Sequence, residues 1–548
     1  MGIADNFRAS MELKKAEKEN KAARLRAETL AIGVQTQALH DFYNSGYSHG
    51  GAASGKTWTE GYNSESLSPK SDIEENRKLL RERSRDLAMN APMAAAAINS
   101  TRTNVVGKGL SPKPKVDAEL LGLSPEGAKE LNQRIKKEFS LWAKSKLCDT
   151  NDLNNFYEMQ QIAFLDWLKN GEEFIQLKYD KATPNMPYEL RLNLIEADRV
   201  CSPNSFGTDY TGEEIKSGAN TIINGVEIDP NGKVVAYHIC SSHPGEFGND
   251  KKWTRVAKRG DKTGNLNIIH LFNAERAAQY RGVPFLAPVI HSVKQLTRYT
   301  EAEVMAAVVN SMFAVFITTE DGNEPEAFTG EMEDDYGAPQ KDLDLQDRFK
   351  LGTGTINFLK NGEAVTPIQA EHPSGAYESF IQSMAMQIGS ALEIAPEVLL
   401  KRFQNNFSAS KGAINETWKS FMMRREWFVS DFCQEVYEIW FAEAVAKGRI
   451  NAPGFFNDPL IRQAYTNATW TGPAQGYLNP VAEVNAAIAR IQNGLSTHED
   501  ECAAINGSDF EDNIRTLKSE NEQLADANSV FEEESDEDQY QRPDSIGR

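Results

Sequence analysis

One short segment has residue types and spacing that could carry out nucleotide chemistry. Residues 50–57 read GGAASGKT and fit the pattern G-x-x-x-x-G-K-[ST] through Gly50, Gly55, Lys56 and Thr57. In a working phosphate-binding loop, a buried strand precedes this pattern and a helix follows it, so that backbone amides point at the phosphates. The flanking segments HDFYNSGYSHG and WTEGYNSESLSPKSD predict neither element. We therefore interpret the pattern as a chance match, and a nucleotide-dependent motor remains the alternative hypothesis.

The other residues that could act in catalysis or metal binding do not form a recognisable set. His238, His243 and His270 lie in a β-rich region without the H-x-x-x-H or H-E-x-x-H spacing of a metal site, so ordinary structural roles are expected. The acidic groups in Asp149–Asp152 and Glu172–Glu173 are expected to be turn or helix-cap features. No G-x-S-x-G or Cys/His arrangement is present. The sequence predicts no catalytic residues, no metal site and no cofactor, and hence no enzyme.

The composition limits the partners that the chain can bind over its whole surface. The 548 residues carry a formal charge of −20, and 40% of them are hydrophobic, enough for a sizeable core. Tight binding to nucleic acid requires clustered Lys and Arg, so this acidic chain can offer only a local basic patch. The five cysteines form no CxxC motif, which argues against a zinc site or disulfide framework and favours a reducing compartment. No apolar run is long enough to predict a membrane-spanning helix, so no membrane partner is expected.

Apolar periodicity in the first half of the chain predicts a mixed α+β fold. Helical patterns cover 72–104, 126–145 and 155–169, and short β segments follow between 172 and 272. The pair Asn224-Gly225 lies between two apolar runs, as does Asn231-Gly232, and both predict antiparallel hairpins.

The second half is predicted to be mainly helical. An acidic insert at 320–347 separates the helices, and a strand pair, GTINFL and EAVTPI, is expected after it. The tail from Phe531 is expected to be disordered, because six of the seven residues 532–538 are acidic. The predicted helices begin at 286 and cover 375–392, 412–447, 480–494 and a segment that starts at the capping box Ser496–Glu499.

A polar loop between two of the predicted helices is a candidate for contact with a phosphate backbone. It covers 393–411 and is longer than most interhelical connections, which suggests a role beyond connecting. Cations and amides can position a protein on phosphates without reading bases. An ordinary interhelical loop explains the same residues equally well. The candidate residues are Lys401, Arg402, Gln404, Asn405, Asn406 and Lys411.

Six segments, in order, resemble one known family. The first is LRERSRDLAMNAPMAAAAINSTRTNVVGKGL (80–110), an Arg-rich helix followed by Asn-Val-Val-Gly. A preceding family segment is represented by Tyr47, Ala52 or Ala53, and Trp58, among which the supposed nucleotide loop lies. The chain is similar, over roughly residues 40–515, to the lambda family of tailed-phage portal proteins. The other segments are LIEADRV (194–200), INGVEIDPNGKVVAYHI (223–239) with HPGE after it, HLFNAERAAQYRGVPFLAPVIHSVKQLTRYTEAEVMAA (270–307), NFSASKGAINETWKSFMMRREWF (406–428) and IARIQNGLSTHEDECAAINGSD (488–509).

This resemblance implies a portal fold with a mixed α/β wing, long stem helices, a small clip and a helical crown, assembled into a ring that is usually a dodecamer. Such a homo-oligomer lies at one capsid vertex of the virion, is assembled in the host cytoplasm, and is the conduit for packaging and ejection of double-stranded DNA of any sequence. The implied partners are the large terminase, which supplies the ATPase, the head-completion or adaptor and tail proteins, the major capsid protein and a scaffold protein. Another capsid or tail structural protein is the remaining alternative.

The resemblance also implies a division of the chain. The clip residues Glu331, Glu333, Asp334 and Asp335 are expected to face the terminase or adaptor. Acidic channel walls would repel DNA and let it slide, while the cations of the loop would make a weak contact with it. The implied parts are an N-terminal arm (1–70), a wing (71–283), a stem helix (284–317), the clip (318–370), a second stem helix (371–392), the tunnel loop (393–411), a long wing helix (412–447), a further wing segment (448–479), the crown (480–515) and an acidic disordered tail (516–548).

Overall fold

The computed structural model describes two compact units, Met1–Ser68 and Pro69–Arg548. The described residues are 65–203, 215–246, 251–311, 315–318, 356–359, 377–403, 407–476 and 479–537, with Lys21, Arg24, Thr57 and Glu60 as isolated positions in the first unit. Three residues of the nucleotide-loop pattern, Gly50, Gly55 and Lys56, therefore lie outside the described residues. The fourth, Thr57, is exposed, and its carbonyl accepts a hydrogen bond from the backbone N–H of Glu60.

The larger unit begins with helices, as the sequence predicts for residues 72–104. A short π-helical turn, η3 (Lys70–Glu74), precedes α2 (Arg77–Asn90) and α3 (Pro92–Val105). The two helices are separated at Ala91, whose backbone is extended (φ −106°, ψ 113°). The residue before a proline is disfavoured in the helical region, which explains a break that the periodicity alone does not show.

Two further helices are confirmed at their predicted positions, and local capping sets their ends. Helix α4 (Pro125–Ala143) starts after Ser124, whose hydroxyl accepts a hydrogen bond from the backbone N–H of Gly127, the third residue of the helix. Helix α5 (Phe156–Asn170) starts with a capping box formed by Asn155 and Glu158, and it ends at Gly171, which is left-handed (φ 85°).

Two sheets follow in the predicted β region. A three-stranded antiparallel sheet has the order β3-β2-β9, and a five-stranded antiparallel sheet has the order β4-β5-β6-β7-β8. Asn224 and Gly225, both at positive φ, form the predicted turn between β5 and β6. Strands β4 and β8 were not expected from the sequence. The strands are β2 (Glu172–Tyr179), β3 (Leu190–Ile195), β4 (Ile215–Ser217), β5 (Asn220–Ile223), β6 (Val226–Ile228), β7 (Val234–Cys240), β8 (Trp253–Ala257) and β9 (Ile268–Phe272).

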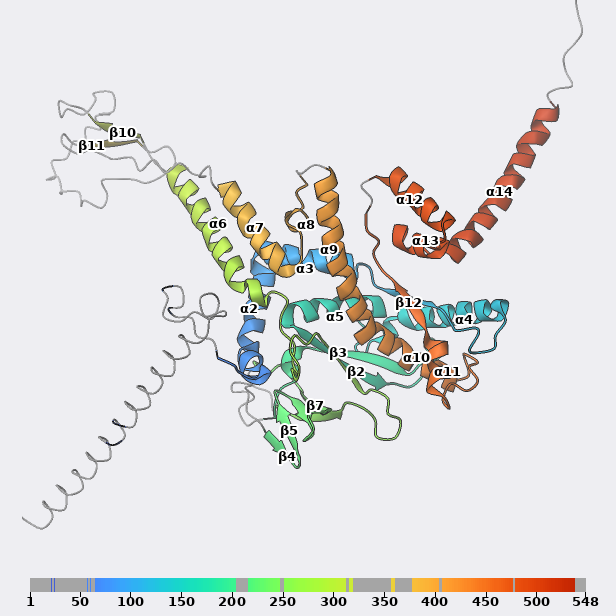
Figure 1. The fold of residues 1–548 in the computed structure, drawn as a ribbon, viewed down its shortest axis with the longest axis horizontal. Coiled ribbons are helices and arrows are strands. Elements are labelled where there is room, and N and C mark those ends of the chain that lie inside the picture. The colour runs from blue at the N-terminus through green and yellow to red at the C-terminus, as the bar shows by residue number, and fades with distance from the viewer. Residues whose placement is uncertain are drawn as a thin grey trace, which may run out of the picture. The chain divides into compact units, whose positions relative to one another are not determined.

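The long helix predicted at 412–447 is confirmed and begins earlier. It consists of α9 (Phe407–Phe428), a π-helical segment η8 (Val429–Gln434) and α10 (Glu435–Ala446), which follow one another without a break. The π-helical segment contacts β9, and α5 lies against β2, so the three-stranded sheet packs against both helices (Figure 1). The helices predicted from 286 and at 375–392 are also present, as α6 (Ile290–Ser311) and α7 (Tyr377–Leu392).

The prediction that residues 393–411 form a loop is wrong in part. Its first half contains a short helix, α8 (Pro396–Leu400), and its last residues belong to α9. Proline at the first helical position is pre-organised for a helix, which explains how α8 forms within an otherwise polar connection. The predicted strand GTINFL is observed as β11 (Ile356–Leu359), which pairs in parallel with β10 (Val315–Thr318), whereas EAVTPI lies outside the described residues.

The core of the larger unit is an aromatic cluster between α4, α5 and the long helix. The ring of Phe139 lies 4.9 Å from that of Trp440, 5.3 Å from that of Tyr437 and 5.8 Å from that of Phe156, measured between centroids. All four side chains are buried. Edge-to-face contacts at these separations add to the hydrophobic stabilisation of the burial itself. A smaller apolar cluster that includes Phe174, Val226, Tyr237 and Ile268 lies between the two sheets.

The C-terminal region is more helical than the sequence predicts. Helix α14 (Phe510–Glu537) covers much of the tail 516–548 that was expected to be disordered, so that prediction is wrong up to Glu537. Leu, Lys, Gln, Ala and Glu are strong helix formers, and here they outweigh the net charge. The cap before α13 (His498–Asn506) is Thr497, one residue after the predicted Ser496. The remaining α-helices and strands are α11 (Pro459–Thr466), α12 (Pro480–Gln492), and β1 (Ser111–Pro114), which pairs with β12 (Ala468–Thr471). Three short 3-10 helices, η4 (Lys146–Cys148), η5 (Ala197–Arg199) and η6 (Ala287–Val289), complete the unit's described elements.

Among the described residues, no helix combines the length and the apolar character that crossing a membrane requires.

A close approach of two glycines connects α5 and β2 to the start of α6 and yields a stability prediction. A Cβ at Gly282 would overlap the carbonyl oxygen of Gly171. We expect Gly282→Ala to lower the free energy of unfolding by about 1–3 kcal/mol, because backbone atoms must move to make room. Gly412 in α9 has no atom near its would-be Cβ, so Gly412→Ala should be neutral or stabilising by up to about 1 kcal/mol. Thermal unfolding of both variants measures the difference, and equal melting temperatures would contradict the prediction.

Candidate functional site

The described cations of the candidate DNA-contact loop do not form one cluster. Lys401 ends α8 in a left-handed conformation (φ 52°), and its side chain is exposed. Arg402 is also exposed and forms an ion pair of 2.6 Å with Glu378 of α7. Lys411 lies within α9 and is 2.5 Å from Glu483 of α12. Exposed ion pairs contribute at most about 1 kcal/mol, so a phosphate could replace these carboxylates at little cost.

The remaining predicted site residues fall outside the described part of the chain. These are the amides of the loop and the acidic clip residues, namely Gln404, Asn405, Asn406, Glu331, Glu333, Asp334 and Asp335.

The strongest electrostatic site is one whose role the sequence analysis missed. Glu172 was expected to be a turn or cap residue, and this is wrong: it is the first residue of β2 and is completely buried. Its carboxylate lies 2.7 Å from the terminal nitrogen of Arg281 and 2.6 Å from that of Arg81. It also accepts a hydrogen bond from the backbone N–H of Gly282 at 3.1 Å. Glu172 is thus the centre of a buried charge network.

The guanidinium of Arg281 connects Glu172 to three backbone carbonyls in two chain segments. It donates to the backbone carbonyls of Ala197 (2.9 Å) and Val200 (2.8 Å), and to that of Asn224 in the β5–β6 turn. Arg offers five donors in a fixed planar arrangement, so one guanidinium can bind the carboxylate and several carbonyls at once. A single side chain therefore holds the β3 exit and the second sheet against β2.

Burial and the surrounding charges determine how the network titrates. Burial by itself would raise the pKa of Glu172, but Arg281, His270 and Arg81 together hold that pKa well below its usual value. Burial lowers the pKa of His270 to about 4, despite a 3.0 Å hydrogen bond to Glu172. At neutral pH, Glu172 is therefore ionised and His270 is neutral. His270 has the structural role predicted for it, as does His238, whose ring nitrogen is 3.0 Å from Glu227.

The neighbouring carboxylate, Glu173, has the opposite environment. It is buried, one of its oxygens has no hydrogen-bond partner among the described residues, and burial together with Asp166 and Glu196 raises its pKa well above its usual value. Burial also raises the pKa of Asp166 to about 6. Adjacent residues of one strand thus point to opposite sides of the sheet, one toward arginines and one toward carboxylates.

One group of described residues has spacing suitable for a metal ion. Ligand atoms of Glu196, Asp198 and His243 lie within 4.8 Å of one another. However, the guanidinium of Arg85 already forms ion pairs with both Glu196 (3.1 Å) and Asp198. Burial opposes ionisation of Asp198, but Arg81 and Arg85 lower its pKa to about 2. The geometry is that of an arginine–carboxylate cluster.

The turn role predicted for Asp149 is confirmed. Its carboxylate accepts hydrogen bonds from three backbone N–H groups of the turn that follows it.

Comparison with known proteins gives a consistent result. Residues 56–425 match the family described as "Phage portal protein, lambda family". The chain is 24% identical over 453 residues to portal protein B of Escherichia phage lambda, covering 78% of this chain and 81% of that protein. It is also 24% identical over 491 residues to the portal protein of Escherichia phage N15, covering 85% and 88%, and 22% identical over 444 residues to a probable portal protein of Halomonas phage phiHAP-1, covering 79% and 77%.

Solved structures of gene transfer agent particles show a weaker likeness. A chain from the virion of the native particle has a TM-score of 0.35 and 11% identity, with 79% of this chain and 94% of that chain covered. A chain from the neck of the native particle, computed with C12 symmetry, has a TM-score of 0.34 and 9% identity, with 78% and 94% covered. TM-scores this low do not establish that this chain and those chains share an arrangement of helices and strands.

The charge network predicts opposite effects for two adjacent substitutions. Glu172→Gln removes the buried carboxylate that Arg81 and Arg281 share, and we expect it to destabilise the protein by about 3–5 kcal/mol at neutral pH. Glu173→Gln removes a carboxyl that resists ionisation in the folded state, so it should be neutral or stabilising at neutral pH.

The pH dependence of the stability difference between Glu173→Gln and the wild type provides a control for this prediction. Below the usual carboxyl pKa of 4.5, Glu173 is protonated in both folded and unfolded states, so its burial costs nothing extra there. As the pH rises above 4.5, the unfolded state ionises first and the wild type loses stability relative to Glu173→Gln. Chemical denaturation at pH 4.5 and 7.5 tests this, and a Glu173→Gln variant that is less stable than wild type at pH 7.5 would refute it.

Proposed function

Since this chain belongs to the lambda family of phage portal proteins, we propose that it forms a ring at one capsid vertex through which double-stranded DNA enters and leaves the head. The match to residues 56–425 is the observation that carries this proposal, supported by two portal proteins of Escherichia phages that align over most of their length. The ring is proposed to be a dodecamer, in agreement with the family resemblance of the sequence. Its location is the portal vertex of the virion, after assembly in the host cytoplasm.

Exposed apolar side chains support self-assembly. Several large hydrophobic residues are 40–80% exposed on helices α6, α12 and α14, although the same chain has a well-packed aromatic core elsewhere. Large exposed apolar patches mark interaction surfaces in soluble proteins. A ring would cover such surfaces by repeating one contact between neighbours. The residues are Val304, Met305 and Val308 of α6, Val481, Val484 and Ile488 of α12, and Ile514, Leu517 and Leu524 of α14.

The helices α6 and α7 are proposed to be the stem that surrounds the channel. The two helices lie side by side (Figure 1). They contact each other through the rings of Tyr299 and Phe380, whose centroids are 4.5 Å apart. The segment between them is the proposed clip, with Glu331, Glu333, Asp334 and Asp335 directed toward the large terminase and later the adaptor. The crown is proposed to comprise α12, α13 and the start of α14.

The chain is proposed to guide DNA and not to move it. Its charge of −20 favours channel walls that repel the duplex and let it slide, with weak contacts at Lys401 and Arg402 that do not depend on sequence. The ATPase activity for packaging is assigned to the terminase, and the Gly50–Thr57 pattern to a chance match. Head-completion, tail, major capsid and scaffold proteins are the other proposed partners.

Imaging of the purified chain tests the proposed function directly. We expect negative-stain micrographs to show rings with a central channel, and sedimentation to give a single large oligomer. Replacing apolar residues of two exposed stripes, Ile488→Glu with Leu517→Glu, should reduce the fraction of rings, because burying the new charges is costly. Phe456→Glu, also at an exposed apolar position, is the control. A wild-type chain that stays monomeric at micromolar concentration would contradict the proposal.

The loop cations give a second prediction. Lys401→Glu with Arg402→Glu should leave ring assembly intact and reduce DNA packaging or retention, because two attractive contacts become repulsive. Glu378→Gln removes the partner of Arg402 without adding negative charge, so it should package normally. Packaging assays and quantification of DNA in filled heads provide the measurement. Normal packaging by the double variant would remove this loop from the mechanism.

A further inference from the structure

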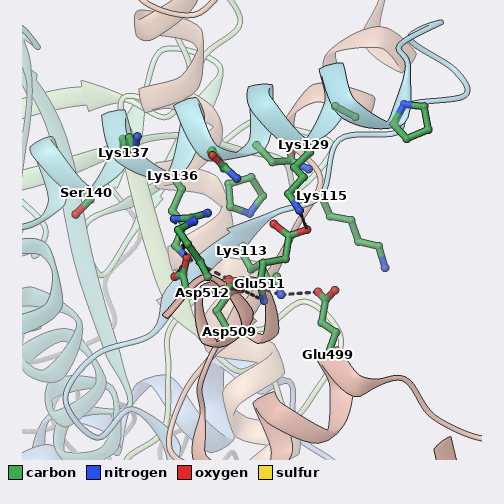
Figure 2. A pocket seen from close by; sticks show the side chains of 16 residues that line it. Lys113, Lys115, Lys129, Lys136, Lys137, Ser140, Glu499, Asp509, Glu511 and Asp512 are labelled. Atoms are coloured by element: carbon green, nitrogen blue, oxygen red, sulfur yellow. Dashed lines mark hydrogen bonds and ion pairs between the residues drawn. The ribbon is translucent and has the colours of Figure 1, made fainter. Parts of the chain in front are cut away.

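A charged cavity lies between α4 and the C-terminal helices. Its volume is about 550 Å³, and six cationic and four acidic side chains line it, in a chain whose net charge is −20. Figure 2 shows lysines of α4 and β1 on one side and carboxylates of α13 and α14 on the other. We call the cationic side the lysine face, defined as Lys113, Lys115, Lys129, Lys136 and Lys137.

The carboxylates form ion pairs with three lysines of this face, and the pair of Lys129 with Glu511 has a separation of 3.4 Å. The ammonium of Lys136 is 2.6 Å from Asp512 and 3.0 Å from Asp509. That of Lys113 is 2.8 Å from Glu499. Burial would lower the pKa of Lys136, but its bonds to Asp512 and Asp509 raise it, so the ammonium is charged at neutral pH. The acidic groups thus occupy the positions that phosphate oxygens would occupy on a lysine cluster.

Apolar packing contributes little to this contact. Within the described residues 480–525, only Ala487 and Glu501 are buried, and Leu495 is 77% exposed. The side chains of Lys136 and Asp512 are themselves 41% and 49% exposed. Ion pairs with this exposure are weak and are screened by salt. Another polyanion can therefore compete with the carboxylates for the lysines.

Two lysines of the face are available without any displacement. Lys115 and Lys137 line the cavity, are exposed, and have no carboxylate within ion-pair distance among the described residues. The cationic side chains around the cavity exceed the acidic ones, so the site attracts anions even with its own carboxylates in place.

We propose that the lysine face binds the phosphate backbone of duplex DNA, and that Glu499, Asp509, Glu511 and Asp512 cover it while DNA is absent. The inference rests on the proposed function, which brings this part of the chain close to packaged DNA. Contact with phosphates releases counterions and requires no base sequence, in keeping with a conduit for any genome. DNA that displaces the carboxylates also loosens the attachment of α13 and α14 to α4, so occupancy of the site is coupled to the position of these helices.

Substitutions on the two sides of the cavity have opposite expected effects on DNA binding. Lys115→Met with Lys137→Met should weaken binding of the full-length chain to a short fluorescent duplex. The logarithm of affinity decreases as the logarithm of salt concentration increases, and this dependence should become shallower in the variant. Between about 50 and 200 mM salt, the magnitude of the slope should decrease by about 1.8, because each of the two lost phosphate contacts contributes about 0.9. Glu499→Gln with Asp512→Asn should tighten binding about threefold or more at the lower salt concentration, because the covering carboxylates are neutralised. Asp509 is left unchanged because it also caps α14.

Matched variants elsewhere control for net charge. Lys419→Met with Lys447→Met removes two positive charges from ion pairs outside the cavity, and Glu416→Gln with Glu189→Gln removes two negative charges from the same pairs. These controls should leave affinity within about twofold of wild type, since they lie outside the lysine face.

Two outcomes overturn the inference. One is a Lys115/Lys137 variant that binds duplex like wild type, and the other is a Glu499/Asp512 variant that binds no more tightly than its charge control. In either case the ion pairs only attach the C-terminal helices to α4. Imaging the same variants separates this result from the proposed function: intact rings with unchanged DNA binding reject the lysine face alone, whereas absent rings in the wild type reject the ring.

Discussion

The buried carboxylate of Glu172 is the interaction on which the arrangement of the larger unit depends. Removing an ionised carboxylate from water costs far more than one ion pair returns, so such a group persists only where several cations and donors converge on it. Arg281, Arg81, His270 and the N–H of Gly282 supply them, from a loop, a helix and a neighbouring strand. The position of each of these elements relative to β2 is therefore coupled to that of the others.

The network also explains the close approach of Gly171 and Gly282. The backbone N–H of Gly282 can reach the carboxylate only if the chain before α6 passes directly over the start of β2, where no Cβ fits. That passage sets where α6 begins. The three-stranded sheet packs against the long helix on its other flank, so the charge network and the aromatic core around Phe139 and Trp440 act on the same structure from two sides.

The larger unit differs sharply between its centre and the helices α6, α12 and α14. The centre buries aromatic side chains and charges with specific partners, whereas α6, α12 and α14 carry apolar residues that the single chain leaves exposed. The contact between α4 and the C-terminal helices is made mainly by exposed ion pairs. In the proposed ring, this division suits a protein whose body must stay rigid while these three helices meet neighbours and DNA.

Local patterns in the sequence determined much of the secondary structure. The Asn224-Gly225 turn and the apolar spacing of the long helix each depend on residues within a few positions, so both could be predicted from the sequence. The family could also be recognised, because its segments occur in order along the chain. Composition was a poorer guide for α14, where helix propensity and the cap at Asp509 prevailed over charge.

Tertiary structure alone decided which charges meet. Glu172 is separated from Arg81, His270 and Arg281 by 91, 98 and 109 positions, and Lys136 is separated from Asp512 by 376. No short-range pattern distinguishes Glu172 from Glu173, yet one is surrounded by arginines and the other by carboxylates, because adjacent residues of a strand face opposite sides of a sheet. The sequence by itself therefore determined the elements and the family, while the packing of distant segments decided which acidic and basic groups are buried together and which remain available to a partner.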